Sequence, residues 1–411
     1  IYIPVYFVRL KLIKGDNLYL KERLGLMLSP VDVCKKSLWI HAVSVGEVLS
    51  LQNLISQMKR KHPEWEVNLS TLTPTGFKIA HQKINQADRI FYLPLDFSWV
   101  VKKYFNQLNP KVFILTESEF WPNLLREAKK RKKGVLLING RISDRSFKRY
   151  YLFRFIFKRV LQNIDLFLVQ SLRDKEKLEK TGVDSKKIII SGNLKADIEL
   201  PDFSEEDILQ FKAELGINHR GKIIVAGSTF KGEEEKIFRA FVRSRERRKE
   251  LLLILAPRHP ERFNEVEKLA QKFSFRLTRK TRLKKEEGWD ILILDTLGEL
   301  TRFYALADAA FVGGSLVPRG GHNILEPAYY QKPIFFGPYM NNFQDLAQRF
   351  LEEEGARVVR NEDDLVEMMI NAGSEKFRQM GRIARKTLIS LQGATQNSLT
   401  AIESFMKNSS K

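Results

Sequence analysis

Apolar segments of strand length alternate with helical segments along most of this chain. In the first half the strand-like segments are rich in β-branched and aromatic residues: SLWIHAV, WEVNLSTL, RIFYLPL, KVFILTE, GVLLING, DLFLVQ and KIIISG. Segments with apolar residues at helical spacing, such as VLSLQNLISQMKRK, follow most of them. This alternation predicts a parallel β-sheet with helices on both faces.

The alternation stops once, at a polar segment near residues 196–205 that carries a proline and is typical of a linker. It restarts with KIIVAGS, LLLILAPR, DILILDT, AAFVGG, PIFFG and ARVV, and ends in a largely helical tail. A chain of 411 residues also exceeds one ordinary hydrophobic core. The sequence therefore predicts two doubly wound α/β domains facing each other across a cleft, over residues 31–200 and 201–411, the second including the helical tail.

Residues 1–30 are expected to form an N-terminal membrane-proximal segment. The opening IYIPVYFVRL is apolar and aromatic but is interrupted by Pro4 and Arg9, and it is too short to span a bilayer. We interpret it as the end of a truncated anchor, since it lacks the small-residue cleavage site of a secretory signal. The single cysteine, Cys34, excludes an intramolecular disulfide.

Positive charge is concentrated in the first half of the chain. Residues 1–200 hold 36 Lys and Arg against 19 Asp and Glu, a net charge of +17 out of the total of +21. Such a field attracts nucleic acid, an anionic membrane surface or a phosphorylated ligand. Part of it lies in SFKRYYLFRFIFKRVL, residues 146–161, which interleaves basic and aromatic residues. That segment fits a membrane-surface helix or a core helix with a basic outer edge, and fits an RNA-binding surface less well.

Glu47, in HAVSVGEV, follows the first predicted strand, where ligands of doubly wound sheets bind. Ser44 and Glu47 have the S-x-x-E spacing of a capping box, in which the two side chains satisfy the first amides of a helix. The same position also suits a general base, because Gly46 allows an acceptor hydroxyl to approach closely. Both interpretations stay open on the spacing alone.

Two more strand ends carry charged residues. Glu117 and Glu119, in ESEFWPN, point to the same face if the strand continues, and their proximity would raise one pKa. They fit an acid/base pair, a metal site, a hydrogen-bonding support or a cap for the helix that opens at Pro122. Lys195, in SGNLK, is either a solvated surface lysine or a point charge for a carboxylate or phosphate.

The second half has its own candidates for anion binding. Pro257 and Arg258 end an apolar strand, where an arginine can fork onto a phosphate. The glycine-rich loop in VGGSLVPRGGHNILEP, residues 312–327, leads from a strand into a helix expected to start near Asn323. Its backbone amides and the helix start favour phosphate binding, and Glu326 could accept hydrogen bonds from ribose hydroxyls or serve as a first-turn charge.

Several nucleotide-binding patterns are absent from the sequence. It has no G-x-x-x-x-G-K-[ST], no strand-linked G-x-G-x-x-G, no H-E-x-x-H and no D-x-D. A metal-clamped nucleotide-sugar site is therefore not expected, and Lys, Arg and helix ends must neutralise a phosphorylated donor.

At this point the motifs HAVSVGE, TPTG, ESEFWPN, NGRIS, GNLK, PRHPERF, LGEL and FVGGSLVPRGGHNILEP together resemble the Kdo transferases of Gram-negative bacteria, from about residue 20 to residue 400. These enzymes move 3-deoxy-D-manno-octulosonic acid (Kdo) from CMP-Kdo to a lipid A precursor. The resemblance implies a GT-B glycosyltransferase fold, a metal-independent reaction without a cofactor, and a position on the cytoplasmic face of the inner membrane.

The resemblance also implies roles for individual residues. Glu47 would be the general base, and Glu117 and Lys195 would support the transition state. The CMP part of the donor would bind residues of the second half: Pro257, Arg258, Leu297, Gly298, Glu299, Asn323, Ile324, Leu325 and Glu326.

The function expected from sequence is thus inverting Kdo transfer from CMP-Kdo to a phosphorylated lipid A precursor (lipid IVA), with the anionic inner membrane as a further partner and no nucleic acid. One alternative is a GT-B enzyme that uses a UDP- or GDP-sugar. Another is a non-enzymatic basic protein that binds a membrane surface or RNA, although this would leave the glycine-rich loop unexplained.

Overall fold

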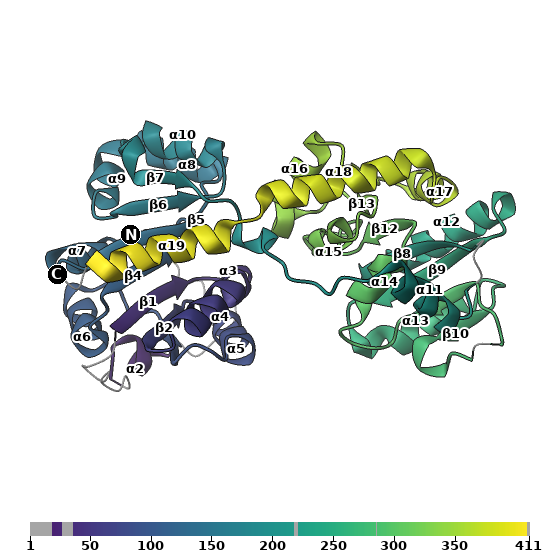
Figure 1. The fold of residues 1–411 in the computed structure, drawn as a ribbon, viewed down its shortest axis with the longest axis horizontal. Helices are drawn as coiled ribbons and strands as arrows, with labels where there is room; N and C mark the ends of the chain where they lie inside the picture. Colours follow the sequence, from purple (N-terminus) through teal and green to yellow (C-terminus); the bar gives the residue numbers. More distant parts are fainter. Residues whose placement is uncertain (1–18, 27–35, 218–220, 285, 409–411) are drawn as a thin grey trace. The chain divides into compact units, whose positions relative to one another are not determined.

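The computed structural model describes residues 19–26, 36–217, 221–284 and 286–408 (Figure 1). The chain divides into two compact units: the first runs up to Asp197 and also contains the segment from Leu391, and the second runs from Ile198 to Ser390. Most of the predicted N-terminal segment, residues 1–18 and 27–30, lies outside the described residues, as does Cys34.

The first unit contains a seven-stranded parallel sheet in the order β3-β2-β1-β4-β5-β6-β7. Its central strands are rich in Val, Ile, Leu and aromatic residues and are buried on both faces, as expected for a parallel sheet. The strands are β1 (Lys36–Ala42), β2 (Trp65–Thr71), β3 (Arg89–Tyr92), β4 (Val112–Thr116), β5 (Gly134–Gly140), β6 (Leu166–Val169) and β7 (Ile188–Ile190).

Helices cover both faces of this sheet, because alternate residues along each strand point to opposite sides. Trp39 of β1 packs with the core formed under α6 and α7, whereas Leu38 and Ile40 pack with α3 and α4. The helices of this unit are α2 (Leu20–Arg23), α3 (Val45–Ser50), α4 (Gln52–Lys61), α5 (Pro74–Lys83), α6 (Ser98–Leu108), α7 (Pro122–Lys130), α8 (Asp144–Leu152), α9 (Arg154–Leu161), α10 (Leu172–Lys180), η1 (Ser185–Lys187), η2 (Leu194–Ala196) and α19 (Ala394–Asn408).

The second unit repeats this architecture with a parallel sheet in the order β10-β11-β9-β8-β12-β13-β14. Its strands are β8 (Lys222–Thr229), β9 (Leu251–Pro257), β10 (Leu277–Arg279), β11 (Ile291–Ile293), β12 (Ala309–Val312), β13 (Ile334–Phe336) and β14 (Ala356–Val358). Two apolar cores again lie on opposite faces of the sheet. The prediction of two doubly wound sheets is therefore confirmed.

The helices of the second unit are α11 (Glu205–Glu214), α12 (Glu234–Arg247), η3 (Pro260–Arg262), α13 (Phe263–Ala270), η4 (Lys280–Arg282), α14 (Leu300–Leu306), α15 (Leu325–Tyr329), η5 (Asn341–Phe343), α16 (Gln344–Glu352), α17 (Glu362–Ile370) and α18 (Glu375–Leu391). Among the helices within the described ranges, none is long and apolar enough to cross a membrane.

Helix α19 requires a correction to the predicted domains. The sequence placed the whole helical tail in the second domain, but the segment from Leu391 belongs to the first unit, where α19 runs alongside β4 and β5 (Figure 1). Its side chains Leu399, Ile402 and Met406 are buried in the core of that unit. Helical periodicity predicts that a helix has an apolar face, but it does not reveal which core receives that face.

Each sheet has one point where the chain reverses its direction of winding. In the first unit this switch point lies between β1 and β4, and in the second between β8 and β12. The loops after two such neighbouring strands diverge to opposite faces of the sheet and leave a crevice, the usual ligand position in this fold class. The residues after these four strands are therefore the first place to look for a site.

The position of α19 predicts that Ile402→Ala destabilises the first unit. Its side chain is fully buried, so truncation leaves a cavity and should lower the free energy of unfolding by about 2–4 kcal/mol. Denaturant unfolding followed by tryptophan fluorescence measures this, because four of the five tryptophans lie in this unit: Trp39, Trp65, Trp99 and Trp121. The control is Ile389→Ala on α18, where the side chain is 54% exposed and little change is expected. Equal effects of the two substitutions would contradict the assignment of α19.

Candidate active site

Glu47 is almost fully buried, 6% exposed, in the first turn of α3, directly after β1. The Val43 amide donates to its Oε2 (2.9 Å) and the Ser44 hydroxyl donates to its Oε1 (2.8 Å). Ser44 Oγ in turn accepts from the Glu47 amide (3.3 Å). The predicted cap is therefore present, with the difference that the carboxylate reaches back to Val43 rather than to the Ser44 amide.

Thr116, the last residue of β4, brings a hydroxyl to Glu47 across the switch point. Its Oγ1 lies 2.8 Å from Glu47 Oε2 and 2.8 Å from the His41 carbonyl oxygen. One hydroxyl proton cannot serve both acceptors at once. When Glu47 is protonated at Oε2, its O–H can donate to Thr116 while Thr116 donates to His41. This arrangement accommodates either protonation state of Glu47.

Burial, followed by the negative charge of Glu117, raises the pKa of Glu47 to about 7. Its hydrogen bonds from Val43, Thr116 and Ser44 oppose that rise. A carboxyl with a pKa near neutral pH can both accept and release a proton under physiological conditions, which is the property a general base requires. The cap interpretation and the base interpretation are thus compatible.

Glu117 departs from the predicted strand geometry. β4 ends at Thr116, and Glu117 adopts a left-handed backbone conformation (φ 56°), so the argument that Glu117 and Glu119 share one strand face is wrong. The two carboxyls are close enough to interact nevertheless, since burial and then the charge of Glu117 raise the pKa of Glu119. Three carboxyls, including Glu47, therefore gather beyond β1 and β4.

Neither of these glutamates caps α7, contrary to that alternative. The helix begins at Pro122, and Asp96 from the loop before α6 accepts the Asn123 amide (3.1 Å) and the Leu124 amide (2.9 Å). Burial raises the pKa of Asp96 to about 6. Glu117 and Glu119 are therefore left free of a capping role.

Lys195 lies beside the cluster of three carboxyl groups formed by Glu47, Glu117 and Glu119. Its Nζ is 3.6 Å from Glu117 Oε1, and a side chain built on Gly46 would begin 3.7 Å from the same Nζ. The three residues predicted to be catalytic, Glu47, Glu117 and Lys195, thus come together within the first unit, from the ends of β1, β4 and β7. Their proximity is a finding of the structure, whereas their roles stay predictions.

Lys195 is held by a chain of amide side chains. The Leu194 amide donates to Asn139 Oδ1 (3.0 Å) and the Lys195 amide donates to Asn193 Oδ1 (2.9 Å). Gln170 connects the two asparagines, donating to the Asn139 carbonyl and accepting from Asn193 Nδ2. The motifs NGRIS and GNLK include the two asparagines, but the sequence did not predict their hydrogen bonds or the part played by Gln170, which ends the predicted strand DLFLVQ.

In the second unit the predicted anion-binding loop is partly occupied by the protein itself. Glu233, fully buried before α12, accepts hydrogen bonds from the amides of Phe230 (2.9 Å), Gly314 (2.7 Å), Ser315 (2.9 Å) and Leu316 (2.8 Å). The expectation that the first half of this loop offers free amides to a phosphate is therefore wrong. An internal carboxylate fills the switch point between β8 and β12.

A basic and aromatic cluster adjoins this loop. Phe230 stacks on His322 (5.5 Å between ring centroids) and meets His259 edge-on (5.1 Å), while Arg319 lies 5.8 Å above the Phe230 ring. Burial, together with the charges of Arg258 and His259, lowers the pKa of His322 to about 4. The exposed Arg258 guanidinium therefore contributes positive potential where the sequence predicted a phosphate.

Helix α15 starts at Leu325, two residues later than predicted, and Asn323 Oδ1 accepts the Leu325 amide (3.1 Å). Glu326 accepts from Asn323 Nδ2 (3.2 Å) and from the Thr301 hydroxyl (2.9 Å). Burial raises the pKa of Glu326.

The side chains of the other predicted donor-binding residues differ widely in exposure. Pro257, Ile324 and Leu325 are buried as whole residues, with Ile324 0% and Leu325 1% exposed. Leu297 is 73% exposed, and the space around Gly298 is open (φ 83°). Glu299 precedes α14 and accepts from the Thr296 hydroxyl.

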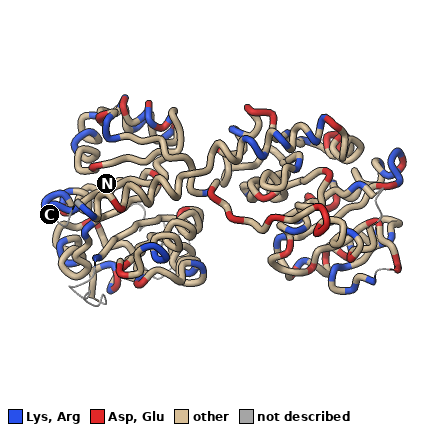
Figure 2. Tube along the Cα trace, viewed as in Figure 1, with Lys and Arg blue, Asp and Glu red and all other residues tan. Residues whose placement is uncertain are grey.

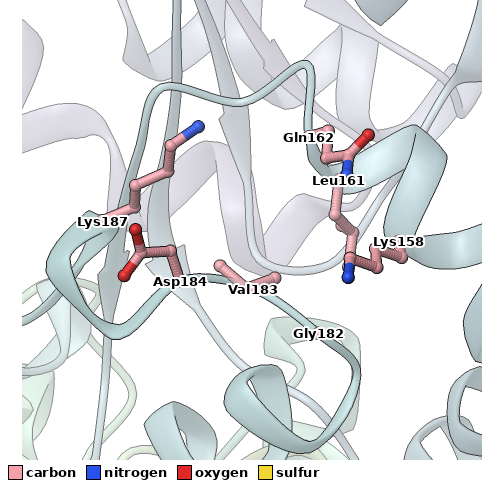
Figure 3. Close-up of a pocket in the computed structure, with 7 residues that line it drawn as sticks. All are labelled: Lys158, Leu161, Gln162, Gly182, Val183, Asp184 and Lys187. Carbon is pink, nitrogen blue, oxygen red and sulfur yellow. The ribbon is translucent and has the colours of Figure 1, made fainter.

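Elsewhere in the first unit, a cavity of ≈ 380 Å³ lies between α9 and the loop before η1. Figure 3 shows Lys187 and Asp184 on one side of it and Lys158, Leu161 and Gln162 on the other. None of the predicted site residues lines this cavity. Across the part of the chain that the structure describes, no group of three or more His, Cys, Asp or Glu side chains is arranged to hold a metal ion.

Solved structures with the same architecture define the fold. A glycosyltransferase from Rickettsia africae aligns with a TM-score of 0.54 and 14% sequence identity over 91% of this chain and 100% of its own. The UDP-GlcNAc 2-epimerase from Neisseria meningitidis aligns with a TM-score of 0.56 and 10% identity, over 90% of this chain and 100% of its own. The two doubly wound units therefore form the GT-B fold of glycosyltransferases, as the motif resemblance predicted.

Sequence similarity identifies the family. The model of the 3-deoxy-D-manno-octulosonic-acid transferases (kdotransferases) matches residues 19–198. The 3-deoxy-D-manno-octulosonic acid transferase of Haemophilus influenzae is 31% identical over 392 residues, which are 94% of this chain and 91% of that protein. This chain belongs to the Kdo transferase family and is a glycosyltransferase.

A bifunctional glycosyltransferase/methyltransferase of Fusobacterium nucleatum is also similar, with 35% identity over 347 residues. The match covers 82% of this chain but only 53% of the relative, so this chain spans about half the length of that protein.

The elevated pKa of Glu47 predicts a specific pH dependence of stability. Because the folded pKa of about 7 exceeds the ordinary glutamate value of 4.5, the contribution of Glu47 is fully present below pH 4.5 and is lost as pH rises through 7. Between these limits the free energy of unfolding of the wild type should fall by roughly 2–3 kcal/mol relative to Glu47→Gln. Denaturant titrations at several pH values measure the difference. Glu64→Gln, at an exposed position, is the control, and parallel curves for wild type and Glu47→Gln would refute the elevated pKa.

Because the Glu233 carboxylate accepts hydrogen bonds from the amides of residues 314–316, we expect Glu233→Gln to loosen this loop. A carboxamide cannot offer both of its polar atoms as acceptors, so at least one buried amide loses its partner, at a cost of about 1–3 kcal/mol. Hydrogen–deuterium exchange with mass spectrometry should show faster exchange in this loop. Glu235→Gln removes an exposed carboxylate from α12, two residues further along the chain, and should leave the loop unchanged. Unaltered exchange in Glu233→Gln would argue against the carboxylate as the element that holds the loop.

Proposed function

We propose that this protein transfers Kdo from CMP-Kdo to a phosphorylated lipid A precursor, with inversion at the anomeric carbon and without a metal ion. Family membership supports the transfer of Kdo. The observation that carries the mechanism is the buried Glu47 carboxyl, which has a pKa of about 7 and stands beside Glu117 and Lys195. The proposed acceptor is a lipid, so the enzyme works at the cytoplasmic face of the inner membrane.

In the proposed reaction Glu47 accepts the proton of an acceptor hydroxyl as the oxygen attacks the anomeric carbon of Kdo. The new C–O bond forms while the bond to the CMP phosphate breaks, and CMP leaves with the electron pair. Lys195 balances the negative charge of Glu117 and of the Kdo carboxylate, so that the donor is not repelled by the three nearby carboxyls.

The departing CMP is assigned to the second unit. Its phosphate charge is stabilised by Arg258, and the cytidine part contacts the segments Leu297–Glu299 and Asn323–Glu326. Pro257, Ile324 and Leu325 are buried and support these segments from within, while Glu326 accepts from ribose hydroxyls. The amides of residues 314–316 take no part, since Glu233 already occupies them.

The test is a transfer assay with CMP-Kdo and a tetraacylated lipid A precursor. Glu47→Gln should lower kcat by roughly 100-fold to 10,000-fold, because general-base catalysis typically contributes that much. The apparent KM for CMP-Kdo should change little, since Glu47 acts on the acceptor. Glu64→Gln serves as the matched control.

Mass analysis of the products shows whether one, two or more Kdo units are added. Near wild-type transfer by Glu47→Gln would rule out this residue as the base. A wild-type protein that ignores CMP-Kdo but uses a UDP- or GDP-sugar would replace the proposal with another GT-B transferase activity.

A further inference from the structure

The segment that carries Lys195 packs against the start of the C-terminal helix. It consists of residues 191–197, follows β7, contains η2 and ends where the chain leaves the first unit. We call this segment the Lys195 turn. The chain re-enters the same unit at Leu391, and α19 begins at Ala394. Two stretches that are distant in the sequence therefore meet where the chain departs and where it returns.

Asp197, the last residue of the Lys195 turn, caps the start of α19. Its Oδ1 accepts from the Gly393 amide (2.7 Å), which lies 196 residues further along the chain, and its Oδ2 accepts from the Thr395 amide. The first amides of a helix have no partner within the helix, and the helix start favours a negative charge. The Asp197 carboxylate supplies both the acceptors and the charge.

The returning chain carries no charge of its own at this point. From Thr387 to Ile402 the sequence has no Asp, Glu, Lys or Arg, and Figure 2 shows this stretch in tan. The first turn of α19 accordingly holds no acidic residue. The start of this helix therefore takes its negative charge from Asp197.

Contacts on the other side of the lysine complete the attachment. The Asn193 amide donates to the Leu391 carbonyl oxygen (3.4 Å). Asn397 Nδ2 donates to the Ser191 carbonyl oxygen (3.1 Å). A Cβ atom on Gly192 (φ 90°) would lie 2.9 Å from the Leu391 oxygen, so this approach of two backbones requires glycine. The returning chain thus holds the turn both before and after the lysine.

The lysine itself stands between two buried residues. Leu194 is 3% and Ala196 0% exposed, and Leu194 packs in the same core as Ala394 of α19. Asn53 of α4 donates to the Asp197 carbonyl oxygen (3.1 Å) and fixes the end of the turn on a further side. The backbone of the turn is therefore enclosed, while the lysine side chain, 24% exposed, extends to the carboxyl cluster.

We propose that Asp197 is a positioning residue for Lys195. By joining the end of the Lys195 turn to the start of α19, its carboxylate holds the Lys195 ammonium 3.6 Å from Glu117. Asp197 touches no substrate and acts through the lysine. The inference rests on the proposed function, in which Lys195 balances the charges of Glu117 and of the Kdo carboxylate.

A double-variant comparison separates this role from a purely structural one. In the transfer assay, Asp197→Ala should lower kcat about tenfold or more, because a misplacement of about 1 Å can cost about 100-fold. In a Lys195→Ala background the same substitution should change kcat by less than about twofold, since the residue through which Asp197 acts is absent. Asp197→Asn keeps one acceptor oxygen and should lie between the wild type and Asp197→Ala.

Asp88→Ala is the matched control. Asp88 Oδ2 also accepts a backbone amide, that of Val67 (2.8 Å), and the carboxylate pairs with Lys59. Asp88 directly precedes β3 and so lies at the amino end of its strand, at the sheet edge opposite the carboxyl cluster. The substitution should lower the stability of the first unit, measured by denaturant unfolding, and should leave kcat unchanged.

Chemical labelling provides a second readout that needs no transfer activity. Acetylation by an amine-reactive ester, followed by mass spectrometry, reports the accessibility of Lys195, and hydrogen–deuterium exchange reports the amides of residues 191–197. Asp197→Ala should speed both severalfold, because the turn loses its attachment to α19. Asp88→Ala should change neither.

Two results would overturn the proposal. One is an equal loss of kcat for Asp197→Ala in the wild-type and Lys195→Ala backgrounds, and the other is unchanged labelling and exchange of the Lys195 turn. Asp197→Asn replaces Asp197→Ala in both comparisons if the alanine variant fails to fold. A wild-type protein that transfers Kdo to no acceptor would refute the proposed function, and the labelling comparison would then decide alone whether Asp197 positions Lys195.

Discussion

A buried carboxylate must find hydrogen-bond donors, and both sheets of this protein use that requirement to close their switch points. In the first unit Glu47 follows β1 and accepts from Thr116 at the end of β4. In the second, Glu233 follows β8 and accepts from three amides that follow β12. In each case one glutamate joins the two strands where the loops diverge, and the loops around it carry the candidate site residues.

The donors around these two glutamates differ, and so does what the carboxylates can do. Glu233 is surrounded by four backbone amides. A backbone N–H group can only donate, and the backbone fixes its direction, so this carboxylate is suited to holding a loop in place. Glu47 has a single backbone donor, and its other two partners are hydroxyls that can reverse their hydrogen bonds. With the charge of Glu117 nearby, Glu47 can change its protonation state without leaving an unsatisfied donor.

Local sequence patterns predicted the sheets, the cap at Glu47 and the strand ends that carry charged residues, because these depend on residues a few positions apart. The features that the sequence did not predict depend on partners that lie far apart along the chain. Asp96 caps a helix that starts at Pro122, and Glu233 meets amides some 80 residues away. The acidic sequence GEEE, which spans the start of α12, was the available signal for Glu233, since a carboxylate at a helix start is often engaged with backbone amides. Nothing comparable indicates that α19 packs on the first unit.

Backbone strain accounts for the remaining difference between the predicted and the observed site. Glu117 and Asn139 both adopt left-handed conformations (φ 56° and 53°); this costs roughly 1–2 kcal/mol for Glu117 and less for Asn139, because asparagine tolerates this conformation. Asn139 uses its conformation to accept the Leu194 amide, which holds the turn that carries Lys195. Glu117 uses its own to leave the strand and reach Lys195. Left-handed backbone at two strand ends therefore goes together with the placement of the lysine beside the carboxyl cluster, which is where strained residues of a functional site are expected.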